Sequence, residues 1–122
     1  MTPDASPAPR RRRASQEAGI QRAIIARLRW HGCMVVHVPN EGKRSARGGR
    51  FAKGIGLRPG FPDLAVYRDG RHALLEVKSP RGRLSPAQIE THAELKRHGA
   101  AVFVVRSQDD ALSALASEGW RL

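Results

Sequence analysis

Alternating apolar and polar positions predict two β-strands within residues 62–78. Asp69 and Gly70 lie between the two strands and form a strong hairpin signal, because both positions of such a turn require a positive φ. If these two residues are the whole loop, counting outward along both strands places Asp63 opposite Glu76.

Successive side chains of a strand point to opposite faces, so Asp63, Glu76 and Lys78 share one face of this hairpin. The other face is the predicted core face and carries Leu64, Val66, Leu75 and Val77. Two directly opposed carboxylates have Cβ atoms about 4.5–5.5 Å apart and repel each other. A hard divalent cation held by their oxygens would offset that repulsion. The alternative is a surface patch in which Lys78 alone neutralises the acids.

The remaining pattern predicts further elements on both sides of the hairpin. A helix is expected from an N-cap at Ser15 to about Trp30, followed by a β-branched strand over residues 33–38. A second helix is expected between Ser85 and Gly99, a strand over residues 100–105, and a last helix after Ser107. This order predicts an α/β fold with a mixed sheet flanked by helices.

Ser85 and Gln88 have the spacing of a capping box, in which each side chain bonds the other residue's backbone N–H. Behind this cap, Ile89, Ala93 and Leu95 form the predicted buried stripe of the helix. The run over residues 100–105 is continuously apolar, which predicts a strand buried on both faces.

The segment over residues 40–60 is too long and too basic for an ordinary connection in a compact domain. We interpret it as a flexible segment that closes on nucleic acid, its glycines allowing close approach and its polar side chains contacting phosphates. The alternative is a disordered basic loop without a role. The candidate DNA-contacting residues in it are Asn40, Lys43, Arg44, Arg47, Arg50, Lys53 and Arg58.

The chain has a net charge of +11, which favours a polyanion as partner. Residues 1–14 are rich in Pro, Ala and Arg and are predicted to be a disordered basic tail. Arg81 and Arg83 follow Lys78 closely and are further candidates for phosphate contacts. Histone-like or ribosomal binding fits this charge as well as catalysis does.

Cys33 is the only cysteine, so no disulfide and no cysteine-based zinc site are expected. No apolar run is long enough to span a membrane, and the N-terminus lacks the apolar segment of a secretory signal. These features predict a cytoplasmic protein.

Two longer strings carry a family resemblance. They are GLRPGFPDL, which contains Asp63, and LLEVKSPRGRLSPAQ, which contains Glu76 and Lys78. Together they resemble the virus-type replication-repair nuclease (VRR-NUC) domain of the PD-(D/E)XK nuclease superfamily. The resemblance covers about residues 15–122, and it implies a restriction-endonuclease-like fold.

The resemblance also implies a set of site residues. Asp63 and Glu76 would bind Mg²⁺ or Mn²⁺, with the Val77 carbonyl as a further ligand, and Lys78 would act beside them. A helix glutamate near the metal matches Glu17, although contact with the helix dipole explains an acid there equally well. The family's glutamine matches Gln88, for which the capping role is the simpler explanation.

The expected activity is metal-dependent cleavage of DNA, with branched or four-way junction DNA as substrate. A two-fold symmetric junction would require a homodimer. The alternative from another class is a non-catalytic basic DNA-binding protein, which would have no need of an acid pair facing a polyanion.

Overall fold

The computed structural model describes residues 10–39 and 54–122 of the chain. Within these ranges it contains a four-stranded sheet in the order β1-β2-β3-β4. The strands are β1 (Met34–His37), β2 (Leu64–Arg68), β3 (Arg71–Val77) and β4 (Val102–Val105). The first three pair antiparallel, whereas β4 joins β3 in parallel. The mixed α/β sheet predicted from the sequence is therefore confirmed.

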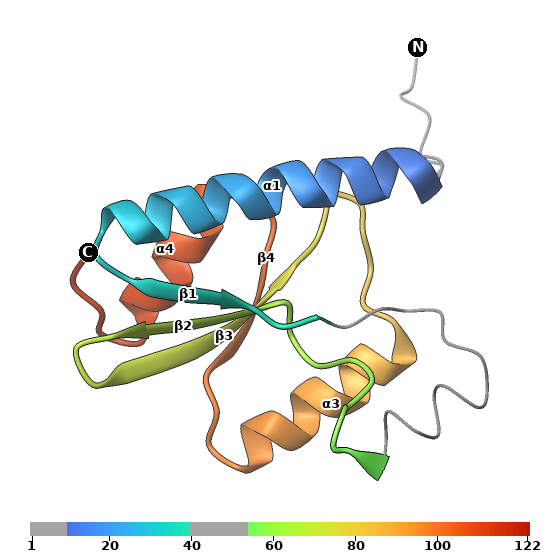
Figure 1. The fold of residues 1–122 in the computed structure, drawn as a ribbon. Helices are drawn as coiled ribbons and strands as arrows, with labels where there is room; N and C mark the ends of the chain where they lie inside the picture. The colour runs from blue at the N-terminus through green and yellow to red at the C-terminus, as the bar shows by residue number, and fades with distance from the viewer. Residues whose placement is uncertain (1–9, 40–53) are drawn as a thin grey trace.

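Helices cover both faces of this sheet (Figure 1). Helices α1 (Arg10–Trp30) and α4 (Gln108–Ser117) pack on one face, and α3 (Pro86–Arg97) lies on the other. The larger apolar core fills the α1–α4 side, and its fully buried members include Ile24, Leu28, Leu64, Leu75 and Leu115. A smaller cluster of Ala65, Leu74 and Val102 lies on the side of α3, together with Leu95.

The central hairpin has the predicted register. Leu64 pairs with Leu75 and Arg68 with Arg71, so Asp69 and Gly70 are the whole loop. Both turn residues have positive φ, 49° for Asp69 and 79° for Gly70, as a two-residue hairpin turn requires. Continuing the register one step beyond Leu64 and Leu75 brings Asp63 opposite Glu76.

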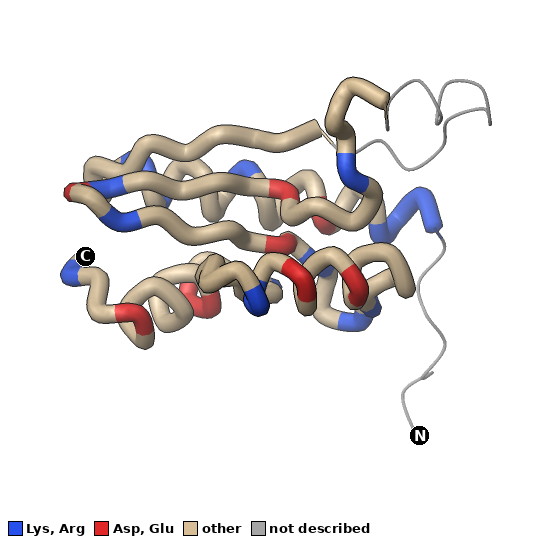
Figure 2. The backbone as a smooth tube through the Cα atoms, turned by 90° about the horizontal axis from the view of Figure 1, so that it is seen from below, with Lys and Arg blue, Asp and Glu red and all other residues tan. Residues whose placement is uncertain are grey.

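The first helix begins earlier than the sequence pattern predicts. Helix α1 starts at Arg10, so Ser15 lies inside the helix and is not its N-cap. The described part of the predicted disordered tail, residues 10–14, is therefore helical, and residues 1–9 lie outside the described ranges. Arginine and alanine are strong helix formers, so the helix extends beyond its apolar stripe. Figure 2 shows this arginine-rich start as a continuous basic segment.

The last strand is not buried on both faces as predicted. Val104 in β4 is 36% exposed, because β4 is the edge strand of the described sheet. Val102 and Val105 are buried on opposite faces, one beside the α3 cluster and one in the larger core. A continuous apolar run does not distinguish a central strand from an edge strand that is covered over part of its length.

The predicted buried stripe of α3 is also wrong in part. Ile89 is 57% exposed and Ala93 is exposed, whereas Thr91 and His92 are buried. The inner face of α3 therefore carries mostly polar side chains, with Leu95 as its apolar member. Apolar periodicity predicts the wrong face of α3, because the buried Glu76 lies under this helix and faces a polar residue, His92.

The segment that leads into β2 is fixed against α3. Thr91 Oγ1 donates a hydrogen bond of 2.7 Å to the Pro59 carbonyl oxygen, and Pro62 is fully buried. Gly60 has a φ of 80°, and a Cβ on it would collide with the Ala87 carbonyl. These contacts set the position from which Asp63 enters the sheet.

No helix in the described part of the chain is long and apolar enough to cross a membrane.

Replacing Gly60 tests this close approach. Gly60→Ala should destabilise the fold by about 2–4 kcal/mol, because it adds a steric clash with Ala87 to the strain of a positive φ. Gly70→Ala is a matched control, since Gly70 has nearly the same φ of 79° and nothing within 4 Å of an added Cβ. The control should cost only about 1 kcal/mol. Equal losses in chemical denaturation of the two variants would contradict the proposed contact.

Candidate active site

Two carboxylates, Asp63 and Glu76, meet where β2 begins and β3 nears its end. Asp63 Oδ2 accepts a hydrogen bond of 2.7 Å from the backbone N–H of Val77. The side chains of Asp63 and Glu76 are themselves hydrogen-bonded to each other. The carboxylate pair expected from the hairpin register is thus brought together, with each acid supplied by a different strand.

This pair does not lie on a solvated sheet face. Glu76 is 1% exposed because α3 lies over it, and His92 Nε2 is 3.1 Å from Glu76 Oε1. A surface patch neutralised by Lys78 alone, the simpler alternative, does not describe such a buried acid. Buried acids are rare unless they are paired or bind a metal, so this burial needs a functional reason.

The environment raises the pKa of Glu76 to about 9. Burial is the largest cause, because it disfavours the charged form, and the hydrogen bond with Asp63 and the Asp63 charge add to it. Lys78 lowers this pKa and Glu17 raises it. The arrangement therefore holds more negative charge than its one lysine compensates.

A hard divalent cation fits this donor set. Carboxylate oxygens are the preferred ligands of such ions, and a dication would offset both the repulsion and the burial of charge. Among the described residues, no group of three or more His, Cys, Asp or Glu side chains is arranged to hold a metal. Asp63, Glu76 and the Val77 carbonyl therefore stay predicted ligands.

Glu17 reaches this site from α1. Its side chain is half-buried, and its Oε1 is 3.3 Å from the place where a Cβ on Gly82 would lie. Its charge also raises the pKa of Glu76, so the two acids act on each other electrostatically. Sequence and structure agree on this neighbourhood, and a metal-related role for Glu17 stays a prediction.

Gln88 forms the predicted capping box. Its Oε1 accepts from Ser85 N at 2.9 Å, and its backbone N donates to Ser85 Oγ at 3.2 Å. These bonds give Gln88 a complete structural role at the start of α3. A direct part in catalysis is not needed to explain it.

The loop after Lys78 is held by Arg106, which the sequence analysis did not identify. Arg106 Nη1 donates to the carbonyl oxygens of Ser79 and Gly82, at 2.6 and 2.8 Å. Arg81 and Arg83 are exposed on this loop. Arg106 follows β4 directly, and its local sequence pattern does not predict these hydrogen bonds.

Arg58 is the one predicted DNA contact of the basic segment that lies within the described residues. It forms an ion pair of 2.7 Å with Glu94 of α3, which lowers the pKa of that carboxyl. The bond with Arg58 ties the segment before β2 to α3. The other candidates, Asn40, Lys43, Arg44, Arg47, Arg50 and Lys53, lie outside the described residues.

His92 is the second site residue that the sequence analysis missed. It lies four residues after Gln88, hence on the same face of α3, and this spacing could have indicated it. The apolar stripe chosen for the helix placed it on the wrong side.

Comparisons with known proteins concern the family and the fold of the chain. A family model of the VRR-NUC domain matches residues 15–109. A solved structure described as a VRR_NUC domain matches with a TM-score of 0.62 and 26% sequence identity, over 86% of this chain and 98% of that chain. Another, described as a VRR_NUC domain protein, has a TM-score of 0.59 and 21% identity, over 82% and 84% of the two chains, and shows the fold alone. No curated protein matches the sequence.

The raised pKa of Glu76 gives a pH-dependent prediction for the metal-free protein. From the ordinary value of 4.5 up to about 9, the folded chain keeps a proton that the unfolded chain has released. The free energy of unfolding therefore falls as the pH rises through this interval. Glu76→Gln keeps the shape and the hydrogen bonds without titrating. It should raise the melting temperature at about pH 8 by about 4 °C or more, and by much less at about pH 5.

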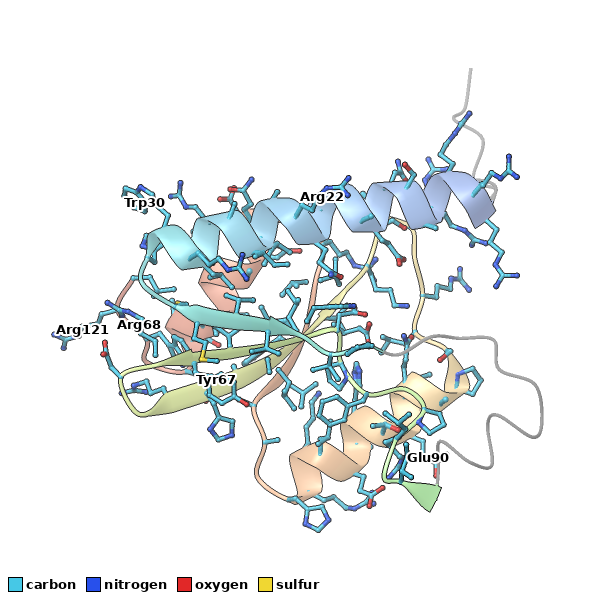
Figure 3. All side chains as sticks on the ribbon, in the orientation of Figure 1. Arg22, Trp30, Tyr67, Arg68, Glu90 and Arg121 are labelled. Atoms are coloured by element: carbon cyan, nitrogen blue, oxygen red, sulfur yellow. The ribbon has the colours of Figure 1, made fainter. Side chains whose placement is uncertain are left out.

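Glu90→Gln is the control for this comparison. Glu90 is on the same side of the sheet, on the exposed surface of α3, and points away from the strands (Figure 3). Thermal melts of the control in a chelator should match the wild type at both pH values. A Glu76→Gln advantage that is constant or shrinks as the pH rises would show that the pKa of Glu76 is not raised in the folded protein.

Proposed function

Because the chain belongs to the VRR-NUC family of nucleases, we propose that it is a metal-dependent endonuclease that hydrolyses DNA phosphodiester bonds. The observation that carries this proposal is the pairing of the half-buried Asp63 with the buried Glu76. An acid pair placed against a polyanion weakens binding unless it holds a cation. Its presence in a strongly basic protein is therefore better explained by catalysis than by binding alone.

Each residue near the pair has a distinct role in this mechanism. Asp63 and Glu76 would hold Mg²⁺ or Mn²⁺, and the chemistry that such an ion would supply is polarisation of a phosphate oxygen and activation of a water molecule. Lys78 is half-buried beside them and supplies a compact positive charge that stabilises charge developing on the phosphate. Glu17 lies at the edge of the site, where it helps to hold the metal or its water ligands.

Basic side chains around the pair position the DNA backbone. Arg81 and Arg83 are exposed on the loop that Arg106 clamps, directly after Lys78. Arg58 is tied to Glu94 and adds charge on the side of α3. Contacts of this kind orient the duplex without reading its sequence.

We propose branched DNA, such as a four-way junction, as the preferred substrate. This choice rests on the family membership and on the predominance of backbone-directed cations over aromatic side chains that could stack on bases. A two-fold symmetric junction is cut on both arms most simply by a homodimer. Incubation with junction, flapped and linear DNA, with and without Mg²⁺, tests this preference directly.

The second candidate function is non-catalytic DNA binding, which the net charge of +11 favours. The two candidates differ in what the acid pair contributes. A binder would gain affinity when an acid is removed, and it would leave DNA intact in Mg²⁺.

Asp63→Ala separates the two candidates. Loss of a metal ligand removes several kcal/mol of transition-state stabilisation, so cleavage should fall by at least about 1000-fold. DNA binding in a chelator, measured by fluorescence anisotropy, should be retained. Asp109→Ala removes an exposed acid in the first turn of α4 and should cut like the wild type. Retained cleavage in Asp63→Ala would reject the mechanism.

The loop arginines, Arg81 and Arg83, should set part of the salt dependence of DNA binding. Replacing Arg81 and Arg83 with Gln should make the slope of the logarithm of the DNA association constant against the logarithm of the salt concentration less negative by about 1.8. Each phosphate contact contributes about 0.9 to this slope. The control double variant replaces Arg22 and Arg97, which are exposed away from the pair, so it removes the same charge. Arg22 lies on the outer surface of α1 (Figure 3). Equal reductions in both double variants would show that only total charge matters.

A further inference from the structure

His92 contacts the Glu76 carboxyl group, whereas His37 Nδ1 lies near the backbone carbonyl oxygen of Asp63. The side chains of His92 and Glu76 are 6% and 2% exposed, and Nε2 of the ring lies 3.1 Å from Glu76 Oε1. The contact lies between α3 and the sheet, and this burial keeps water away from it. A metal ligand must be deprotonated, and an ionised carboxylate only accepts hydrogen bonds, so in the metal-bound state the ring would donate through Nε2–H.

The two acids are supported in parallel ways. Asp63 Oδ2 is held by the backbone N–H of Val77 at 2.7 Å, and Glu76 Oε1 is held by His92. Each carboxyl group thus has one oxygen within hydrogen-bond distance of a nitrogen atom. Fixing one oxygen limits the rotation of the group, and a rigid pair of ligands loses less entropy on binding an ion.

We propose that His92 is a positioning residue that orients the Glu76 carboxylate for metal binding. This inference rests on the proposed function, because it assigns a role toward the ion that Asp63 and Glu76 would bind. The Nε2 atom of His92 is engaged by Glu76 Oε1, so the role assigned to it is to hold that carboxyl group. Hydrogen bonds to ligating carboxylates are worth about 10–100-fold in metal affinity or activity.

Two amide variants test the role of the donor atom. The amide nitrogen of Gln reaches the place of histidine Nε2, whereas that of Asn reaches only the place of Nδ1. His92→Gln should therefore keep the affinity for Mn²⁺ within about threefold of the wild type. His92→Asn should weaken it by about 10–100-fold. Calorimetric titration with Mn²⁺ alone, without DNA, gives the affinity independently of cleavage.

A purely structural role would give a different result. Both variants would then lower the metal-free melting temperature, and the affinity of the folded protein for Mn²⁺ would not follow the position of the donor. Wild-type affinity in His92→Asn, or an equal loss in both variants, would overturn the proposal. His92→Phe keeps a ring of similar size without a donor and should behave like His92→Asn.

The same titration distinguishes failure of this inference from failure of the proposed function. Wild-type protein should bind Mn²⁺, and Asp63→Ala should lose that binding. If the wild type binds no Mn²⁺, the proposed function and the role of His92 fall together. If binding depends on Asp63 but not on His92, only the present inference is overturned.

Discussion

The structure depends on one register, the pairing of β2 and β3 that brings Asp63 opposite Glu76. A shift of one strand by one residue would turn its acid to the apolar face and its leucine to the face under α3, so the two acids would no longer share a face. The turn at Asp69 and Gly70 fixes this register from one end, and the bond between Val77 N–H and Asp63 fixes it from the other. The hairpin register alone therefore places the two acids opposite each other, without help from any helix.

The two faces of the sheet differ in role: one carries most of the apolar core, and the other carries the candidate site. The face under α1 and α4 is apolar, and fully buried side chains such as Leu64, Leu75 and Leu115 supply most of the burial. The face under α3 buries Glu76, Thr91 and His92, which cost free energy unless each has a partner. The apolar face offsets this cost, so the polar face can hold a destabilising pair of acids.

The sequence predicted those features that depend on neighbours in the chain. The hairpin turn, the capping box of Ser85 and Gln88 and the cap at Ser107 all follow from local backbone chemistry, and all are observed. The inner face of α3 was predicted incorrectly, because apolar periodicity assumes that a buried face is apolar, and here Thr91 and His92 form it. Arg106 was missed for another reason, since its acceptors, such as Ser79, lie far from it in sequence.

Under the proposed function, the summed charge of the residues at the site explains how a basic protein can keep two paired acids and still bind DNA. In the metal-free state Glu76 holds a proton near neutral pH, and Lys78 balances Asp63, so Glu17 leaves a single net negative charge. If a dication replaced the proton on Glu76, as the proposed function requires, the same cluster would gain one positive charge and become neutral. Phosphate would then no longer be repelled, although the site itself would attract it little. The proposed function therefore assigns affinity to the surrounding arginines and chemistry to the pair, so each should be alterable without the other.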